Sequence, residues 1–159
     1  MPVSSRVEEV RAEITALAEN SRTAKDLMQG VCRTLHERML KYNWVGVYLL
    51  EPGAKPPMLV LEAFVGAMTP HTRIPLNQGI CGAAASSGKT IVVDDVSKDP
   101  RYLACSLETK SEIVVPIFVR GKVAGELDID SHFPAAFSVE DQGLVQYCAE
   151  VVGKKLEKS

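Results

Sequence analysis

The side chains of this 159-residue chain that could carry out chemistry gather between residues 73 and 131. Near the end of this stretch, the segment ELDIDS alternates two apolar residues, Leu127 and Ile129, with three acidic ones. The acidic residues are Glu126, Asp128 and Asp130. Side chains of a strand alternate between the two faces of a sheet, so the three carboxylates are predicted to share one face. That face is either exposed to solvent or lines a pocket in which a cation or a protonated amine offsets the repulsion.

Two cysteines lie in the same stretch. Cys81 belongs to the segment QGICG. The glycines of this segment and the small residues that follow it predict a short helix, with Cys81 in its first turn. The helix macrodipole favours a thiolate there, so the pKa of Cys81 is expected to fall below its ordinary ~8.5. Cys105 stands near the end of residues 94–109, a segment rich in turn-forming residues and without sustained hydrophobic periodicity. Such a segment is predicted to be a long loop, and long ordered loops are frequently functional. Both cysteines are therefore candidate redox or nucleophilic residues.

The other two cysteines, Cys32 and Cys148, lie on or beside the apolar stripes of predicted helices, and we interpret them as small core residues. No two cysteines have the CxxC spacing, and the three histidines lie far from the cysteines in the sequence. The sequence therefore shows no zinc-binding pattern, and no metal is expected. In a reducing compartment the cysteines are expected to be thiols at rest.

The charges and hydropathy of the chain argue against two classes of partner. Lys and Arg total 18 against 20 Asp and Glu, with no basic run, which disfavours nucleic acid. No apolar stretch reaches the ~18 residues of a membrane span, and the N-terminal segment MPVSSRVEEVRAEI is charged and helix-periodic rather than signal-like. We therefore expect a cytoplasmic protein that binds neither nucleic acid nor a membrane.

The hydrophobic periodicity predicts a single α+β domain. Its strands follow one another through hairpin-like links, which is typical of an antiparallel sheet with helices packed on it. Helices are predicted over residues 3–20, from a cap at Ser21 to about Tyr42, and from a cap at Ser138 to about Leu156, and the longer strands over residues 43–50, 58–65, 111–119 and 123–130. In the first strand, Trp44, Gly46 and Tyr48 share a face. They are either ordinary packing or the floor of a small-molecule cavity.

Several short motifs occur in a fixed order along the chain. They are Asn43-Trp44 with Gly46 and Tyr48-Leu49-Leu50, Arg73-Ile74-Pro75, Gly79-Ile80-Cys81-Gly82, Ala104-Cys105, Ser111-Glu112-Ile113-Val114 and Leu127-Asp128-Ile129-Asp130-Ser131. In this order they resemble a GAF domain and, within that fold, the free methionine-(R)-sulfoxide reductases. The resemblance implies one GAF domain over residues 1–159, with N-terminal helices over residues 1–41 and a GAF core over residues 42–156.

The resemblance also implies roles for particular residues. By it, Cys105 is the nucleophile and Cys81 a resolving cysteine, while Trp44 and Tyr48 form the walls around the methyl-sulfur end of the substrate. The polar side of the pocket is then formed by Glu112, Asp128 and Asp130. The implied substrate is free methionine sulfoxide, the implied setting is oxidative stress, and a homodimer is compatible with the family.

The chemistry of these residue types agrees with the implied reaction. A thiolate attacks the sulfoxide sulfur while an acid protonates the oxygen, and methionine then leaves a sulfenic acid on the cysteine. A second thiol condenses with the sulfenic acid to a disulfide, which an external dithiol such as thioredoxin reduces, as the family implies, so that no bound cofactor is needed. Carboxylates would bind the ammonium group of a free amino acid, which a residue within a peptide lacks.

One residue departs from the family pattern. The family usually has a further cysteine two residues before the Arg-Ile-Pro motif, where this chain has His71. Three alternatives follow: Cys81 alone resolves Cys105, a small external thiol does so, or the activity has been lost. We interpret His71 itself as a surface loop residue without a role. A competing hypothesis is a GAF small-molecule-binding or regulatory module without catalysis.

The shared carboxylate site depends on the register of the last hairpin. A two-residue turn at Gly121-Lys122 would place Glu112 opposite Ser131, on the face away from Asp128 and Asp130. A three-residue turn, or a bulge near Pro116 after a two-residue turn, sets Glu112 opposite Asp130 instead. We therefore predict an odd-length turn or a bulge, an edge or bulge position for the proline, and a raised pKa for at least one carboxyl group in the crowded site.

Overall fold

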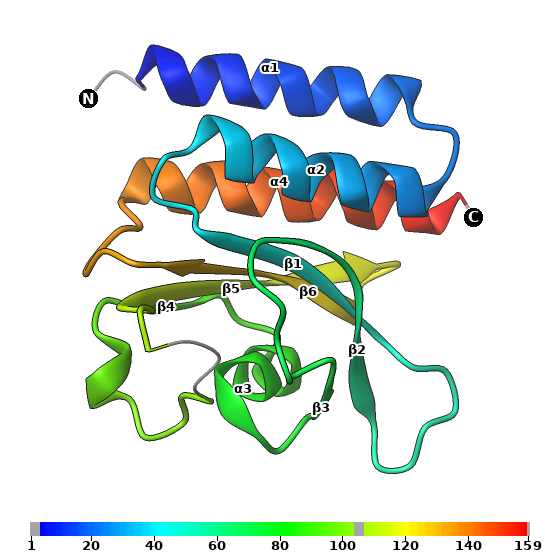
Figure 1. Ribbon diagram of the computed structural model, residues 1–159. Coiled ribbons are helices and arrows are strands. Elements are labelled where there is room, and N and C mark those ends of the chain that lie inside the picture. The colour runs from blue at the N-terminus through cyan, green and yellow to red at the C-terminus, as the bar shows by residue number, and fades with distance from the viewer. Residues whose placement is uncertain (1–3, 104–106, 159) are drawn as a thin grey trace.

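The computed structural model describes residues 4–103 and 107–158 and has a layered α+β architecture (Figure 1). α1 forms an outer layer, α2 and α4 pack between α1 and one face of a six-stranded antiparallel sheet, and α3 covers the other face. The helices are α1 (Ser5–Asn20), α2 (Ala24–Arg38), α3 (Gly79–Ser87) and α4 (Val139–Glu157). The strands are β1 (Trp44–Leu50), β2 (Met58–Val65), β3 (Arg73–Pro75), β4 (Ile91–Val93), β5 (Ser111–Val119) and β6 (Lys122–Ser131), with a 3-10 turn over Val96–Lys98 after β4. The predicted antiparallel sheet with packed helices is confirmed.

The boundaries of α2 differ from those predicted. Thr23, not Ser21, caps this helix, because the Thr23 hydroxyl oxygen accepts a hydrogen bond from the backbone N–H of Asp26 at 3.1 Å. The helix ends at Arg38, short of the predicted end near Tyr42, because the residue after Arg38 takes an extended backbone conformation. Within the described part of the chain, no helix combines the length and the apolar character needed to cross a membrane.

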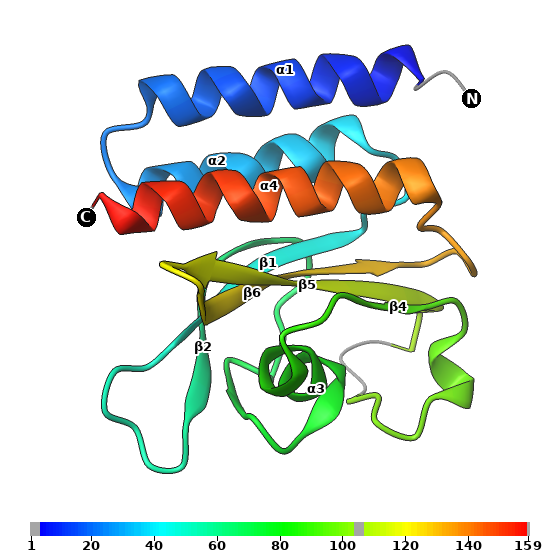
Figure 2. The ribbon, with the colours of Figure 1, turned by 180° about the vertical axis from the view of Figure 1, so that it is seen from behind.

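The core between the helices and the sheet holds two of the cysteines. Cys32 of α2 and Cys148 of α4 are fully buried there, which confirms their interpretation as small core residues. Burial raises the pKa of each thiol to about 12, so neither is a reactive thiolate. Figure 2 shows α4 lying along β5 on this face, away from α3.

Replacing Cys148 with alanine is expected to cost about 1 kcal/mol of unfolding free energy, because it removes one buried sulfur atom from the helical side of the sheet. Any activity of the chain should stay within a few-fold of the wild type, and Cys32→Ala should behave alike. Urea denaturation measures the first effect and an activity assay the second. A disulfide to either cysteine in the oxidised protein, detected by peptide mapping, would contradict this prediction.

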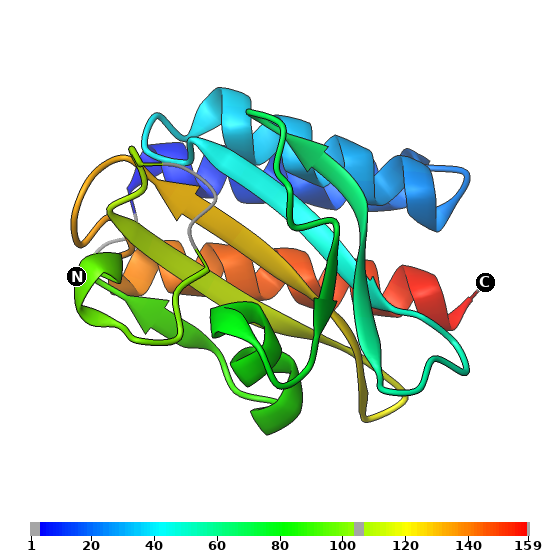
Figure 3. The ribbon, with the colours of Figure 1, turned by 60° about the horizontal axis from the view of Figure 1, so that its bottom comes forward.

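The strand order is β3-β2-β1-β6-β5-β4, so β1 and β6 lie at the centre of the sheet (Figure 3). The register of this central pair sets the aromatic and glycine face of β1 beside the acidic residues of β6. The paired residues are Trp44 and Asp130, Gly46 and Asp128, and Tyr48 and Glu126. The aromatic and acidic residues therefore lie on one face of the sheet, as the pocket implied by the resemblance requires.

The β5–β6 hairpin brings a further carboxyl group to the same face. Its turn consists of Arg120 and Gly121, whose φ angles of 50° and 79° are the left-handed values that a two-residue hairpin turn needs. A bulge then leaves Ala124 of β6 without a partner in β5. Glu112 consequently pairs with Asp130, which confirms the predicted bulge and register. The turn begins one residue earlier than predicted.

The proline of β5 lies at an edge, as predicted. β4 pairs only with residues 112–114 of β5. Pro116 lies past that pairing, on a part of β5 whose outer side has no strand partner among the described residues. A residue without a backbone N–H is tolerated there because no ladder hydrogen bond is lost.

Candidate active site

Four carboxyl groups are buried on the face of the sheet that α3 covers. Glu112 comes from β5, and the other three come from alternate positions of β6. Their exposed fractions are 5% for Glu112, 0% for Glu126, 4% for Asp128 and 4% for Asp130. The acidic face was interpreted as either exposed to solvent or lining a pocket, and exposure to solvent is therefore wrong. The acidic residues line the inside of the protein.

α3 brings a thiol into this cluster. The helix starts at Gly79, whose φ of 71° is left-handed, and the turn that follows buries Cys81 against the sheet. The Cys81 thiol donates a hydrogen bond to Oδ2 of Asp128 at 3.4 Å. The structure thus joins Cys81, Glu112, Asp128 and Asp130, all of which the sequence predicts as site residues.

The aromatic residues of β1 close one side of the cluster. The Trp44 and Tyr48 ring centroids lie 6.4 Å apart, and each ring is fixed by a hydrogen bond. The Trp44 indole N–H donates to the carbonyl of Ala67 at 3.0 Å, and the Tyr48 hydroxyl donates to the carbonyl of His71 at 2.7 Å. A Cβ atom at Gly46 would lie 2.3 Å from the Trp44 ring, so the space that this glycine leaves is filled by the indole.

Burial raises the pKa values of the carboxyl groups in this cluster. Burial raises the pKa of Glu112 well above its ordinary value, and the charges of Asp128 and Asp130 raise it further. Burial likewise raises the pKa of Asp130, with Asp128 adding to the shift. For Asp128 burial raises the pKa, while hydrogen bonds from Glu112 and Cys81 partly offset the rise. The predicted raised carboxyl pKa is confirmed in direction, so the site can hold a carboxylic acid able to donate a proton.

The expected low pKa of Cys81 is wrong. Burial raises this pKa well above its ordinary value, and the neighbouring charges of Asp128, Glu126 and Glu112 raise it further. A helix N-terminus contributes roughly 0.3–1 kcal/mol in favour of an anion. Full burial shifts a pKa by up to ~3–5 units, which is several times more free energy. Desolvation and like charge therefore outweigh the macrodipole, and Cys81 is a thiol at rest.

Glu126 is a member of the cluster that the sequence analysis did not include among the site residues. The signal was present, because the alternation in ELDIDS already puts Glu126 on the face of Asp128. Neither carboxyl oxygen of Glu126 receives a hydrogen bond of normal geometry from the described residues. Burial raises the pKa of Glu126 well above its ordinary value. Since a buried unpaired carboxyl group is costly, Glu126 weakens the fold at neutral pH.

Replacing Glu126 with glutamine is expected to stabilise the protein more at pH 8 than at pH 5. An acid whose folded pKa is raised loses stability as the pH rises above its unfolded pKa of about 4.3, at about 1.4 kcal/mol per pH unit until the folded pKa is reached. Glutamine has a similar shape and does not titrate, so the gain of the variant over the wild type should grow across this window. Urea denaturation at both pH values, with exposed Glu19→Gln as the control, measures it. A gain that does not depend on pH would contradict the prediction.

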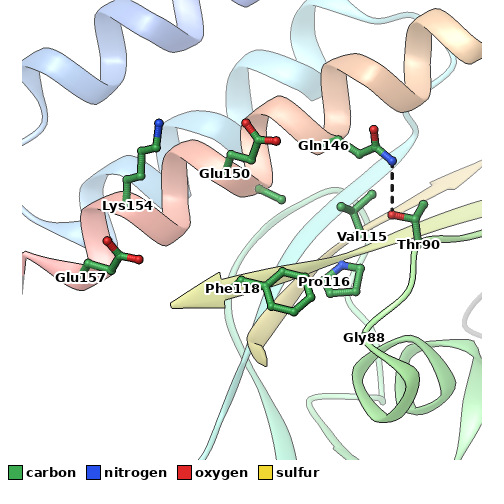
Figure 4. Close-up of a pocket in the computed structure, with 10 residues that line it drawn as sticks. Gly88, Thr90, Val115, Pro116, Phe118, Gln146, Glu150, Lys154 and Glu157 are labelled. Carbon is green, nitrogen blue, oxygen red and sulfur yellow. Dashed lines mark hydrogen bonds between the residues drawn. The ribbon is translucent and has the colours of Figure 1, made fainter. Parts of the chain in front are cut away.

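Two cavities are lined in part by residues of the cluster. The first has a volume of about 20 Å³, and its lining includes Tyr48, Cys81, Glu112 and Asp128. The second has a volume of about 130 Å³ and is lined partly by Trp44, Thr109 and Asp130. A wider hollow of about 340 Å³ lies between α4 and β5 (Figure 4). None of the four buried carboxyl groups and no cysteine lines it, so this hollow is separate from the cluster.

The predicted nucleophile Cys105 lies outside the described residues. The described residues on either side of it reach the cluster. Leu103 lines the cavity of about 20 Å³, and Thr109 lines the cavity of about 130 Å³. His71, which stands where the family usually has a cysteine, lines the smaller cavity together with Cys81.

Known proteins are similar to this chain in both sequence and fold. The GAF domain family matches residues 23–156. Over 118 residues the chain is 39% identical to the free methionine-R-sulfoxide reductase of Escherichia coli (strain K12), with 74% of this chain and 68% of that protein covered. The structure of the free methionine-R-sulfoxide reductase from Neisseria meningitidis, in complex with its substrate, is similar with a TM-score of 0.89 at 33% identity, covering 99% of this chain and 93% of that one. For the type II free methionine-R-sulfoxide reductase from Thermoplasma acidophilum the TM-score is 0.79 at 42% identity, with 89% and 96% covered.

Proposed function

This chain belongs to the GAF domain family, in the group that contains the free methionine-R-sulfoxide reductases, and we therefore propose that it reduces free methionine-R-sulfoxide to methionine. The enzyme is an oxidoreductase acting on the free amino acid. The observation that carries the proposal is the joining of Glu112, Asp128 and Asp130 with Trp44 and Tyr48 on one buried face. Each of these was predicted from the sequence as a substrate-binding residue.

The two halves of the site suit the two ends of the substrate. The aromatic rings of Trp44 and Tyr48 offer apolar walls for the methyl-sulfur end. The buried carboxyl groups offer acceptors for the ammonium group, and an ionised carboxylate makes strong hydrogen bonds to such a cation. A methionine residue within a peptide has no ammonium group, so it would leave these acceptors unpaired in a buried site. The geometry thus supports a preference for the free amino acid.

In the first step, the Cys105 thiolate attacks the sulfoxide sulfur. A protonated carboxyl group of the cluster gives its proton to the sulfoxide oxygen, and Glu112 suits this role because its pKa is raised by burial and by Asp128 and Asp130. The oxygen is then transferred to the Cys105 sulfur as methionine leaves. Methionine sulfoxide is reduced, and the cysteine is oxidised to a sulfenic acid.

In the second step, Cys81 resolves the sulfenic acid. Its thiol condenses with Cys105 to a disulfide and releases water, and an external dithiol such as thioredoxin, or a small thiol, returns both cysteines to the reduced state. Cys81 suits this later role better than the first one, because its raised pKa keeps it a thiol while Cys105 reacts. The two Cα atoms must come within ~4.4 to 6.8 Å for the bridge to form.

Replacing Cys81 with serine is expected to leave one turnover per enzyme and to slow repeated turnover at least ~10-fold, because the sulfenic acid then waits for an external thiol. Methionine released in a single turnover and under steady-state conditions measures the two quantities. Peptide mapping of the oxidised wild type should find the bridge between Cys81 and Cys105. Mixed disulfides with glutathione in its place would assign resolution to a small external thiol.

The proposed activity is tested by incubating the reduced protein with methionine sulfoxide and measuring released methionine. Free methionine-(R)-sulfoxide should be reduced, whereas the (S) epimer and N-acetylmethionine sulfoxide, which lacks the ammonium group, should react poorly. A thioredoxin-coupled assay that follows NADPH consumption tests the reductant. A protein that binds free methionine sulfoxide but releases no methionine would instead be a GAF small-molecule-binding module, for which the replacement of a family cysteine by His71 is the motivating observation.

A further inference from the structure

Three side chains from different elements converge on one point of the candidate site. Cys81 comes from α3, Glu112 from β5 and Asp128 from β6. One donor atom from each lies within 4.8 Å of the other two. The Cys81 sulfur and Oδ2 of Asp128 are 3.4 Å apart, a separation close to that between two ligands of one tetrahedral metal ion. The sequence spacing gave no sign of a metal site, because these ligand types are joined only by the fold.

A cavity of suitable size lies at the same point. Its volume is about 20 Å³, and Cys81, Glu112 and Asp128 are among the residues that line it. A cavity of this kind holds a single water molecule, since about 10–15 Å³ suffices for one. A single metal ion has a comparable size. His71 lines the cavity too.

Buried oxygens without partners supply an independent observation. Oδ1 of Asp128 and both carboxyl oxygens of Glu126 receive no hydrogen bond of normal geometry from the described residues, although both residues are at least nine-tenths buried. Glu126 lies close enough to Cys81 to act on its charge. None of the lysine and arginine side chains in the described ranges forms an ion pair with the four buried carboxyl groups. Buried acceptors without partners are costly, and a cation held by Asp128 would lower that cost.

We propose that Cys81, Glu112 and Asp128 form a binding site for one divalent transition-metal cation of the zinc class. Zinc accepts thiolate and carboxylate ligands in tetrahedral geometry. Magnesium and calcium prefer oxygen ligands alone, so the cysteine selects against them. Three protein ligands leave a fourth position for water or for a neighbouring side chain.

The proposed metal occupies groups that the reductase needs. The ion holds Cys81 as a thiolate, whose proton is released to solvent on binding, so that Cys81 is not free to resolve the sulfenic acid. It also holds Glu112 and Asp128, which bind the substrate or protonate it. The metal-bound protein is therefore an inhibited form of the enzyme. This consequence rests on the proposed function, whereas metal binding itself does not.

Cobalt(II) is the probe, because it takes zinc sites and its visible spectrum reports tetrahedral geometry and thiolate ligation. The reduced full-length protein is titrated with Co²⁺ in the absence of substrate. One Co²⁺ per chain is expected, with a thiolate-to-cobalt charge-transfer band and the ligand-field bands of a tetrahedral ion. Zn²⁺ should displace it and Mg²⁺ should not. A titration without a charge-transfer band would overturn the proposal.

Matched variants locate the ion. Cys81→Ser should lose the charge-transfer band, and Asp128→Asn should keep the band while its affinity falls at least ~10-fold. Cys148→Ser, another fully buried thiol, is the control and should match the wild type. A band that persists in Cys81→Ser would place the ion on another cysteine and overturn the assignment. If circular dichroism shows that Cys81→Ser does not fold, the affinity of Asp128→Asn decides, and unchanged affinity counts against the site.

The activity assay separates this proposal from the proposed function. A protein that shows the cobalt spectrum but releases no methionine has the metal site and lacks the reductase activity. A protein that releases methionine but shows no cobalt spectrum has the activity and lacks the metal site. Zn²⁺ should inhibit the first turnover of the wild type more strongly than that of Asp128→Asn. Equal inhibition of the two proteins would contradict the inference that the ion at this site inhibits the enzyme.

Discussion

Replacing Cys105 with serine is expected to abolish the release of methionine from free methionine-(R)-sulfoxide, even in a single turnover with excess enzyme. A serine hydroxyl is not ionised near neutral pH and is a far weaker nucleophile than a thiolate. No described cysteine can take its place. Burial raises the pKa of Cys81, Cys32 and Cys148, and the last two lie on the helical face of the sheet. Quenched single-turnover reactions analysed for methionine measure the loss.

The matched control for this variant is Cys148→Ser, which changes the same atoms at a cysteine remote from the carboxylate cluster. It should release methionine at the wild-type rate within a few-fold. Binding of methionine sulfoxide should survive in Cys105→Ser, because the carboxylates and aromatic walls are untouched. Undiminished single-turnover release in Cys105→Ser would remove this cysteine from the mechanism and leave Cys81 as the remaining candidate.

Replacing Glu112 with glutamine is expected to lower kcat/KM for free methionine-(R)-sulfoxide at least ~100-fold, the usual scale for loss of a general acid. The amide has the same shape but cannot give a proton to the sulfoxide oxygen. Because the acid must be protonated to act, wild-type activity should fall as the pH rises through the raised pKa of the cluster. The variant should lack this part of the profile. Steady-state kinetics over a pH series measure both effects.

Exposed Glu19→Gln is the control for the glutamine substitution and should leave the rate and the pH profile unchanged. The variant Glu112→Gln should fold at least as well as the wild type, because it removes an acid from a buried cluster of like groups. Its loss of activity therefore reports on chemistry rather than on unfolding. A wild-type rate with a wild-type pH profile in Glu112→Gln would show that another carboxyl group is the proton donor.

The sequence predicted which residues share the site better than it predicted their state. The alternation in ELDIDS is enough to put Asp128 and Asp130 on one face, because the period of two is fixed by backbone geometry. The position of Glu112 depended on one extra residue in the hairpin, so it could be stated only as a requirement for a bulge. The structure meets that requirement at Ala124.

The errors concern burial, which a local pattern does not measure. Cys81 was expected to ionise easily because its position in the helix is visible in the sequence, whereas the carboxyl groups around it come from strands far along the chain. The same long-range packing makes Glu126 a buried member of the site and not one acidic residue of an open face. The role of Cys105 stays a prediction.

The outermost helix, α1, extends the hydrophobic core beyond the segment that matches the GAF family. α1 lies before residue 23, where the match to the GAF family starts, yet Val7, Val10 and Ile14 belong to the same core as the sheet. A fragment trimmed to the family boundary would uncover the apolar surfaces of α2 and α4 that these residues cover, and such surfaces drive association between chains. The segment that matches the family is thus shorter than the segment whose side chains build the core.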